Sequence, residues 1–478
     1  MNTTMLRALR NGLCATAAAV LVLGGGGKAK AFTATDATNM WNSYNNAFYV
    51  GNGGNAYYRR NQGGGMDTTG FWSNAELIEM AIDRAQRSGS AGDKTIVTAL
   101  VNGFDATYGT DWTGNIYNDD IMWACIAHLR AYFVTGSTQT SWAVTAANNF
   151  NWVYNGGHSP GRTAAQVDGT YGGGMWWTTD HSASATKNAC VNGPAAIAGY
   201  YLSVIWPSGT GFLSQAQGIY NWEKSHLVNS SGYVYDNYGS SGAQGYDLTY
   251  NAGTYIGAAY LLGDWTAAGL AANTTMGGGG ILQNFGTGGG NNCGFNGIFM
   301  RWMALYMQGS GTQQNYSVWL YNNANTALAR KNASGLSWDD WFDNTPASGL
   351  YSWDCSPSVV ALQALPPTSN TMNSATTLTG GQELINGNHA FIMQTDGNLV
   401  EYNGTTAIWA SGTWGHPGAY CSMQADGNLV VYSSTGGALW ASGTYGHSGA
   451  YCTLQSDGNV VIYSSTGGAL WATGTNGR

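Results

Sequence analysis

The spacing of apolar residues changes once along the chain, near residue 366. Before that point, apolar side chains recur at three- and four-residue intervals, which is the period of an amphipathic helix. Long loops rich in Gly, Trp and Tyr separate these segments. The pattern therefore predicts an all-α domain over residues 32–365, built as a ring of paired helices whose loops surround a cleft. The twelve expected helices are 33–49, 71–87, 93–108, 118–134, 139–154, 182–205, 211–227, 246–262, 265–272, 293–307, 312–328 and 356–365.

After a linker at residues 366–371, the helical period gives way to strict alternation. One motif then occurs three times, as MQTDGNLVEY, MQADGNLVVY and LQSDGNVVIY, and a tryptophan follows each copy. Alternating apolar residues with Asp-Gly turns indicate short antiparallel strands. Residues 372–478 are therefore predicted to form a second, all-β domain with approximate threefold symmetry.

Each copy of the motif has the pattern Q-x-D-x-N-x-V-x-Y. Because alternate residues of a strand share a face, its Gln, Asp, Asn, Val and Tyr should lie on one side. Such a face can donate and accept several hydrogen bonds to one hydroxyl-rich ring. The Asp-Gly-Asn segment also suits a simple hairpin turn. A turn alone does not explain why Gln and Tyr recur in register in all three copies.

This triple pattern closely resembles the bulb-type mannose-binding lectins of monocots and their bacterial relatives. The resemblance implies a β-prism II fold with one mannose pocket per repeat and no metal. The fifteen implied pocket residues are Gln394, Asp396, Asn398, Val400 and Tyr402; Gln424, Asp426, Asn428, Val430 and Tyr432; and Gln455, Asp457, Asn459, Val461 and Tyr463.

A pair of carboxylates, Asp119 and Asp120, opens the helical segment 118–134 in a chain that is only 9% charged. Acidic residues are common at helix starts, where they cap the helix or favour its dipole. Glycosidic cleavage offers another reason, because it generally uses two carboxyl groups, and close placement separates their pKa values. The aromatic neighbours Tyr117 and Trp123 favour this second interpretation. The residues alone leave the stereochemistry of such a reaction open.

The segment Tyr117-Asn118-Asp119-Asp120-x-x-Trp123 resembles the signature of glycoside hydrolase family 76, the endo-α-1,6-mannanases. Similar pieces include FWxxAExIE from Phe71 and LTYNAG from Leu248. The resemblance implies an (α/α)6 toroid and a reaction that retains configuration at the anomeric carbon. It makes Asp119 the nucleophile and Asp120 the acid/base, and it implies that Asp236 contacts sugar.

Several other side chains are candidates for sugar contact or for structure. Trp176 and Trp177 either stack on a sugar or cover the core. Asn188 either binds a hydroxyl or caps the following helix. Glu76 and Glu79 are expected on a solvated or salt-bridged helix face. His128 is expected to be a hydrogen-bonded core residue.

Composition narrows the class of partner and the compartment. A net charge of −8 with few basic residues does not fit a nucleic-acid partner. A basic start, an apolar run at 13–23 and an Ala-x-Ala site ending at Ala31 predict a signal peptide at residues 1–31 and a secreted protein without a membrane span. Six cysteines follow it, which permits disulfides without fixing their pairing. No zinc motif occurs, so no metal or cofactor is expected. Nothing indicates an oligomeric state.

Both halves of the sequence independently point to mannose. The expected protein is a secreted endo-α-1,6-mannanase with a mannose-binding module, and its partner is an α-mannan polysaccharide or oligosaccharide. Two alternatives remain: a transglycosylase on the same fold, and a mannose-binding lectin or adhesin whose helical domain is inactive.

Overall fold

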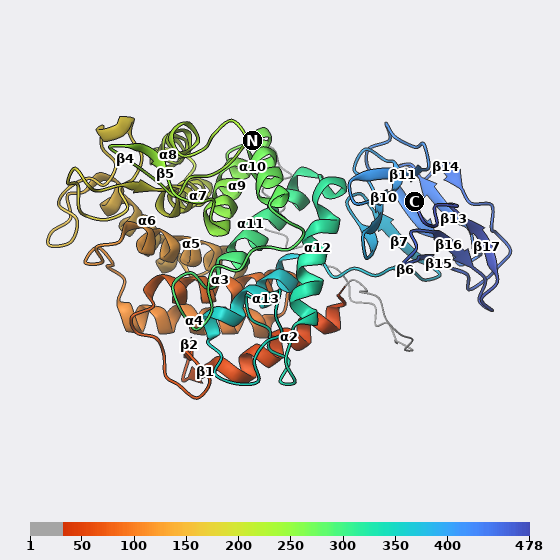
Figure 1. Ribbon diagram of the computed structural model, residues 1–478, viewed down its shortest axis with the longest axis horizontal. Helices are drawn as coiled ribbons and strands as arrows, with labels where there is room; N and C mark the ends of the chain where they lie inside the picture. Colours follow the sequence, from red (N-terminus) through yellow and green to blue (C-terminus); the bar gives the residue numbers. More distant parts are fainter. Residues whose placement is uncertain (1–31) are drawn as a thin grey trace. The chain divides into compact units, whose positions relative to one another are not determined.

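The computed structural model describes residues 32–478, so the expected signal peptide at residues 1–31 lies outside the described part (Figure 1). The described chain forms two compact units. One contains Asn39–Tyr306 and Arg330–Ala364, and the other contains residues 32–38, Met307–Ala329 and Leu365–Arg478.

The described residues contain twelve α-helices, all between residues 34 and 364, which confirms the predicted helical class. Most expected bounds agree to within three residues. The expected helix 182–205 begins later, at Ala189, because Lys187 and Asn188 pair as a strand with Tyr238 and Asn237. The helices are α2 Ala34–Phe48, α3 Phe71–Ser88, α4 Ala91–Tyr108, α5 Asn118–Val134, α6 Thr140–Asn155, α7 Ala189–Ile205, α8 Phe212–His226, α9 Thr249–Leu261, α10 Trp265–Gly277, α11 Phe295–Ser310, α12 Gln313–Ala329 and α13 Ser352–Ala364.

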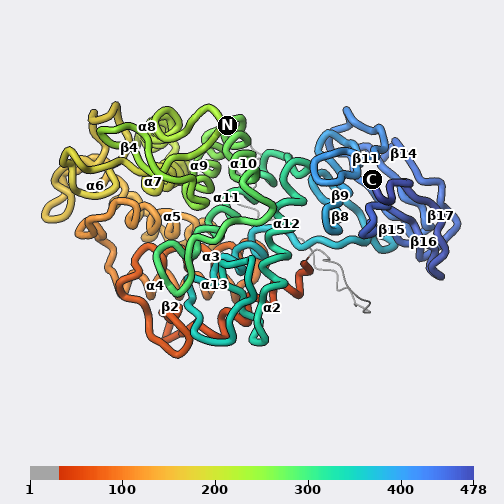
Figure 2. Tube along the Cα trace, in the orientation of Figure 1, coloured from red at the N-terminus to blue at the C-terminus, as the bar shows by residue number. Residues whose placement is uncertain are grey.

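Six alternate helices form a closed inner ring in the first unit. Helix α3 packs on α5, α5 on α7 and α7 on α9, and α13 packs back on α3 (Figure 2). Glycines allow the remaining close approaches: a Cβ on Gly253 of α9 would lie 2.7 Å from the Cα of Phe299 on α11. A Cβ on Gly297 of α11 would lie 3.0 Å from the Cα of Pro357 on α13. The ring brings the amino ends of α3, α5 and α13 and the loops that precede them around one pocket.

Short strands decorate this ring. A hairpin is formed by β1 Tyr49–Asn52 and β2 Asn55–Tyr58. A three-stranded sheet combines β3 Lys187–Asn188, β4 Asn237–Gly239 and β5 Gly242–Gln244. Because β3 leads directly into α7, this sheet fixes where α7 begins.

The strands of residues 371–472 form three four-stranded antiparallel sheets, which confirms the predicted all-β class. The sheet orders are β11-β10-β9-β8, β14-β13-β12-β7 and β17-β16-β15-β6. The strands are β6 Thr371–Met372, β7 Thr376–Thr379, β8 Glu383–Asn386, β9 His389–Met393, β10 Leu399–Asn403, β11 Thr406–Ala410, β12 Tyr420–Met423, β13 Leu429–Tyr432, β14 Ala438–Ala441, β15 Tyr451–Leu454, β16 Val460–Tyr463 and β17 Ala469–Ala472.

A shared apolar core joins the three sheets. Trp409, Trp440 and Trp471 meet edge to face, with ring centroids 5.4–5.7 Å apart. The three tryptophans that follow the repeats therefore pack against one another and serve the fold.

The six cysteines between Cys125 and Cys452 are all buried free thiols in the described chain. The disulfides that the even count permitted are not formed among these residues. No helix within residues 32–478 combines the length and the apolarity that a membrane crossing requires.

Candidate active site

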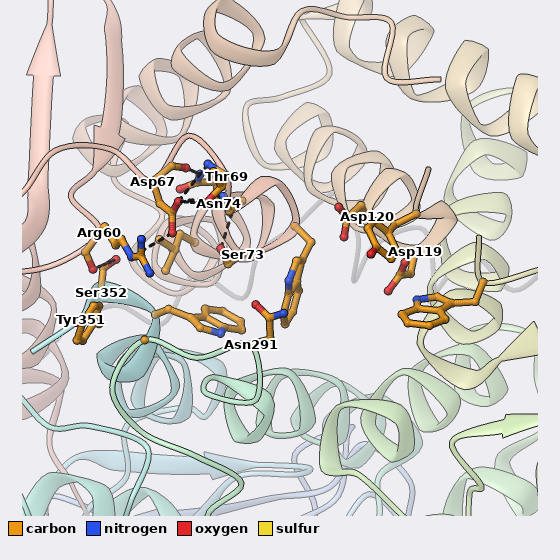
Figure 3. A pocket seen from close by; sticks show the side chains of 17 residues that line it. Arg60, Asp67, Thr69, Ser73, Asn74, Asp119, Asp120, Asn291, Tyr351 and Ser352 are labelled. Atoms are coloured by element: carbon orange, nitrogen blue, oxygen red, sulfur yellow. Dashed lines mark hydrogen bonds and ion pairs between the residues drawn. The ribbon is translucent and has the colours of Figure 1, made fainter. Parts of the chain in front are cut away.

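A pocket of about 400 Å³ lies in the first unit, and the paired aspartates form part of its wall (Figure 3). Ligand sites commonly measure 300–1,000 Å³, so this pocket can hold a few sugar units. Its walls combine aromatic rings with carboxylates and amides. The lining residues are Arg60, Asp67, Thr69, Gly70, Trp72, Ser73, Asn74, Leu77, Tyr117, Asp119, Asp120, Trp177, Gly289, Asn291, Tyr351, Ser352 and Trp353.

Neither carboxylate of the pair caps helix α5. The cap position is Tyr117, whose side chain makes no capping hydrogen bond. The Asn118 amide instead donates to the Gln166 side chain (3.0 Å) and to the Trp176 carbonyl (2.8 Å). Asp120 accepts from the Asn115 amide at 2.8 Å, and Asp119 Oδ1 is buried with no hydrogen bond to a described residue. Helix capping therefore does not account for the two adjacent charges.

Burial raises the pKa of both carboxyls of the pair. The pKa of Asp119 rises to about 7 through burial and the charge of Asp120, against hydrogen bonds from Cys190 and Trp177. The pKa of Asp120 rises to about 6 through burial, against the hydrogen bond from Asn115. The higher of the two pKa values falls on Asp119, but because two interacting carboxyls titrate as a unit, the single proton belongs to the pair and can reside on Asp120. Near neutral pH the site can therefore offer one carboxylate and one carboxyl.

A second layer of polar groups lies behind Asp119. The Cys190 thiol is hydrogen-bonded to Asp119 and to the Tyr250 hydroxyl, and its pKa is raised by burial and by the charges of Asp119 and Asp236. Asp236 accepts from the Asn251 amide at 3.0 Å. Asp236 thus stands near the pair but does not line the pocket, and its expected sugar contact stays a prediction.

The five expected sugar-contacting residues other than Asp236 divide into two groups. Tyr117 and Trp177 line the pocket beside the pair, 41% and 37% exposed, with ring centroids 5.6 Å apart. Trp123, Trp176 and Asn188 are at least 94% buried and do not line it. Their side chains are covered by protein, so the structure gives these three no direct place in the pocket.

Trp176 instead belongs to a hydrogen-bonded loop between residues 168 and 177. Its indole donates to Asp168 at 2.9 Å. The fully buried Lys187 ammonium donates to Asp168 (2.9 Å) and to the carbonyls of Thr170 (2.8 Å) and Gly173 (2.7 Å). This ammonium ties the glycine-rich loop to β3 and so fixes the position of Trp177 at the pocket.

The wall farther from the pair was not expected from the sequence. Asn74 donates to the Asp67 carbonyl (2.7 Å) and to the Tyr108 hydroxyl (2.9 Å), and Figure 3 shows Asp67 and Asn74 across the pocket from Asp119 and Asp120. Trp72 and Trp353 add an aromatic floor, with ring centroids 4.9 Å apart. Of these residues, only Trp72 lies in a motif that the sequence singled out.

The buried glutamates of α3 correct one expectation. Glu76 and Glu79 are not solvated; they are buried and ion-paired with Arg301 and Arg130 at 2.6 and 2.7 Å. The salt-bridged alternative is therefore right. His128 is a buried core histidine as expected, because its ring nitrogens lie 2.9 Å from the Ala124 carbonyl and from Asp105.

The three repeats of the second unit form hairpins, but the expectation that all five pattern residues lie on a strand is wrong: Gln, Asp and Asn lie in the turn between two strands, and only Val and Tyr lie on a strand. In each repeat, the Gln side chain donates to the Tyr hydroxyl at 2.8–2.9 Å, from Gln394 to Tyr402 and likewise in the other two copies. Asp396, Asp426 and Asp457 are exposed. Val400, Val430 and Val461 lie outside the apolar core cluster, whereas their neighbours Leu399, Leu429 and Val460 belong to it. The three valines thus lie on the strand face opposite the core, and the Gln–Tyr hydrogen bond links that face to the turn.

Residues 32–478 contain no cluster of three or more His, Cys, Asp or Glu side chains that could hold a metal ion.

Comparison with known proteins identifies relatives of each unit. The model of glycosyl hydrolase family 76 matches residues 28–379. A solved structure of an α-1,6-mannanase from Salegentibacter sp. HEL1_6 is 26% identical, with a TM-score of 0.59, over 69% of this chain and 98% of that one. That structure is an inactive variant in which two consecutive aspartates are asparagines, in complex with α-1,6-mannotriose.

The C-terminal segment matches bulb-type mannose-binding lectins. It is 52% identical to the mannose-specific lectin of Narcissus pseudonarcissus over 65 residues, which are 13% of this chain. The chain spans 60% of the length of that lectin. A monomeric monocot mannose-binding lectin from Gastrodia elata is 46% identical over 23% of this chain and 99% of that one, with a TM-score of 0.22.

Proposed function

The chain belongs to glycosyl hydrolase family 76, and on this basis we propose that its helical domain is an endo-acting α-1,6-mannanase that retains configuration at the anomeric carbon. The single observation that carries the proposal is the half-buried Asp119–Asp120 pair in the wall of an aromatic-lined pocket. The inactive Salegentibacter enzyme, altered at two consecutive aspartates, supports the same assignment.

In the proposed reaction, the Asp119 carboxylate attacks the anomeric carbon and forms a mannosyl ester. The Asp120 carboxyl gives its proton to the glycosidic oxygen as that bond breaks, which releases the shorter mannan chain. Asp120, now a carboxylate, then takes a proton from water, and the resulting hydroxide displaces Asp119 from the anomeric carbon. The carboxylate and the water attack opposite faces of the anomeric carbon and each step inverts it, so the two displacements give net retention, and the single proton of the pair is restored.

The pocket surroundings suit this chemistry. Tyr117, Trp177, Trp72 and Trp353 offer aromatic faces for the apolar sides of sugar rings. The Asn115 amide holds Asp120 at 2.8 Å, and the Lys187-anchored loop fixes Trp177. Because both carboxyls are already oriented before the sugar binds, they need to move less to reach the transition state.

Product analysis on linear α-1,6-mannan tests the proposal. We expect the wild-type protein to release short manno-oligosaccharides from within the chain, with the α anomer formed first in an NMR time course. A falling average chain length at low conversion would indicate endo action. Initial β product would rule out retention, and longer products without new reducing ends would favour the transglycosylase alternative.

The second part of the proposal concerns the repeats and the compartment. We propose that the three repeated faces bind mannose and that the protein is exported through its N-terminal segment. In the first face, Asn398 Oδ1 accepts from the Thr413 backbone, whereas its Nδ2 makes no hydrogen bond with a described residue. Asp396 Oδ1 accepts from the Asn398 backbone, and its carboxylate is exposed. These groups and the Gln394–Tyr402 pair can meet the hydroxyls of one sugar together.

Three weak pockets on one chain can act through avidity. Replacing Asp396, Asp426 and Asp457 together by alanine should leave only the binding of insoluble mannan by the catalytic pocket, because each repeat loses its charged acceptor. Hydrolysis of a short soluble oligosaccharide should stay within about twofold, because these exposed side chains lie outside the catalytic pocket. Co-sedimentation with insoluble mannan measures the binding, and initial rates on the soluble oligosaccharide measure the hydrolysis. If the variant bound insoluble mannan as well as the wild type, the repeats would not be the binding sites. If it also lost hydrolysis of the soluble oligosaccharide, the protein would be misfolded.

A further inference from the structure

Two large aromatic side chains stand exposed at the same position of two repeats. Trp414 is 71% exposed and Tyr445 is 69% exposed, and both follow a Ser-Gly-Thr segment. The other large rings of this domain do not share this exposure, since Trp409, Trp440 and Trp471 pack against its core. A core role therefore does not explain Trp414 or Tyr445.

The loop that carries Trp414 is fastened to the first mannose face. The Thr413 hydroxyl donates to the Gly397 carbonyl (2.7 Å), and the Thr413 backbone donates to Asn398 Oδ1 (3.0 Å). On the other side of Trp414, the His416 backbone donates to the Asp396 carbonyl at 2.9 Å. Trp414 is thus held between two residues that are bonded to the Asp-Gly-Asn turn of that face.

The second repeat reproduces these bonds around Tyr445. The Thr444 hydroxyl donates to the Gly427 carbonyl (2.7 Å), and its backbone donates to Asn428 Oδ1 (3.0 Å). The His447 backbone donates to the Asp426 carbonyl at 2.9 Å. The same scaffold therefore presents a ring beside two of the three faces.

The third repeat keeps the threonine bond but not the ring, and its second bond comes from the residue directly after Asn476, one position earlier than in the other two repeats. The Thr475 hydroxyl donates to the Gly458 carbonyl at 2.6 Å, and the Gly477 backbone donates to the Asp457 carbonyl at 2.7 Å. The residue between them is Asn476, which is exposed. The backbone bonds are thus independent of the aromatic ring, and the third face is an internal reference for the other two.

We infer that Trp414 and Tyr445 are accessory sugar platforms, each of which stacks on a further mannose unit of a chain whose first unit occupies the adjoining face. An exposed ring fixed at the rim of a sugar site offers the flat apolar surface that a pyranose ring can cover. The recognised ligand would be a neutral, extended mannan chain. The first and second faces would therefore prefer oligosaccharide over monosaccharide, and the third would not.

This inference rests on the proposed mannose binding by the repeats, so its test measures both ligand lengths. The full chain carrying Asp119→Asn, which should not hydrolyse the ligand, is titrated calorimetrically with methyl α-mannoside and with α-1,6-mannotriose. A matched protein that also carries Asp396→Ala, Asp426→Ala and Asp457→Ala reports binding by the catalytic pocket alone. The difference between the two proteins gives binding by the repeats.

Trp414→Asn together with Tyr445→Asn copies the residue of the third repeat. This variant should bind mannotriose roughly three- to tenfold more weakly, the range expected for loss of an aromatic contact. Its affinity for methyl α-mannoside should stay within about twofold, because both side chains are exposed and support no packing. Asn476→Trp should have the reverse effect and strengthen mannotriose binding at the third face.

The outcomes separate the two proposals. Equal preference for mannotriose in the wild type and in the double variant would overturn the platforms while leaving mannose binding by the repeats intact. Equal loss of both ligands would also overturn them, because a platform beyond the first sugar cannot affect a monosaccharide. Absence of binding to either ligand in all proteins would refute mannose binding by the repeats and the platforms with it.

Discussion

Asp119→Asn and Asp120→Asn should each lower the rate of α-1,6-mannan hydrolysis by roughly 10²–10⁴-fold or more, the range for loss of a positioned acid or base. Asparagine keeps the size and hydrogen-bonding capacity of each side chain but supplies neither the nucleophile nor the proton. The thermal midpoint should not fall, because each substitution removes a charge that burial disfavours. Initial rates of reducing-end release measure the effect.

The two variants should differ once the leaving group needs no proton. An aryl α-mannoside with an acidic phenol should partly restore cleavage by Asp120→Asn, whose defect is proton donation. It should not restore cleavage by Asp119→Asn, which cannot form the mannosyl ester. Asp180→Asn is the matched control, since Asp180 is exposed and lies outside the pocket wall. Restoration of Asp119→Asn alone would reverse the two roles.

The pH profile of the wild-type enzyme also reports on the protonation of the Asp119–Asp120 pair. The raised pKa of the pair, about 7 for Asp119 and about 6 for Asp120, means that its last proton leaves near neutrality. We therefore expect kcat/KM to fall as the pH rises above about 7, because no carboxyl then remains to protonate the leaving oxygen. At low pH activity falls because no carboxylate remains to attack.

Arg301→Met should destabilise the helical domain by about 3–5 kcal/mol, because it leaves buried carboxylates without their partner. The Arg301 guanidinium contacts Glu76 at 2.6 Å, Glu79 at 3.2 Å and Asp83 at 2.7 Å, and all four side chains are buried. Denaturant unfolding monitored by tryptophan fluorescence measures the loss. A change below about 1 kcal/mol, within the range of an exposed ion pair, would contradict the described burial.

Glu76→Gln is the matched comparison for this cluster. Burial raises the pKa of Glu76 to about 7, against the attraction of Arg301. A carboxyl with a folded-state pKa above its unfolded value favours folding at low pH, and this contribution is lost as the pH rises toward about 7. The stability of Glu76→Gln relative to the wild type should therefore increase between pH 5 and pH 7. An unchanged difference would show that Glu76 stays ionised throughout.

The spacing of apolar residues predicted most helices, but it did not predict the strand that precedes α7. The period of 3.6 residues placed α5 at 118–134, where the structure has Asn118–Val134. It extended α7 toward residue 182, because apolar spacing does not reveal that Lys187 pairs with Tyr238 some fifty residues later. A pair of strands that are distant in the sequence leaves no periodic pattern in the residues near either strand.

The candidate site was predictable only where chemistry and position coincide in one motif. Asp119, Asp120 and Tyr117 share such a motif and line the pocket. Trp176 and Trp177 are adjacent in the sequence, yet Trp176 is buried and Trp177 lines the pocket. Which of the two turns inward depends on Asp168 and Lys187, whose contacts with this loop appear only in the folded chain.

The opposite wall could not have been assembled from the sequence. Its residues come from the loop before α3 and the first turns of α3, from a loop near residue 290 and from the segment that opens α13. Only closure of the helical ring brings these segments together. The partners of Glu76 and Glu79 were hidden for the same reason, since Arg130 and Arg301 lie on helices α5 and α11.

The strand order of the β domain also dictates when that domain can fold during synthesis. Strand β6 pairs with β15, so that Thr371 meets Thr453 across a separation of 82 residues, and β7 pairs with β12. The third sheet cannot close until residues up to Ala472 have left the ribosome, because its first strand, β6, must wait for β15, β16 and β17. Until then β6 and β7 present open edges, to which another nascent chain could add. The lectin-like domain is therefore the late and vulnerable step in biogenesis of the whole protein.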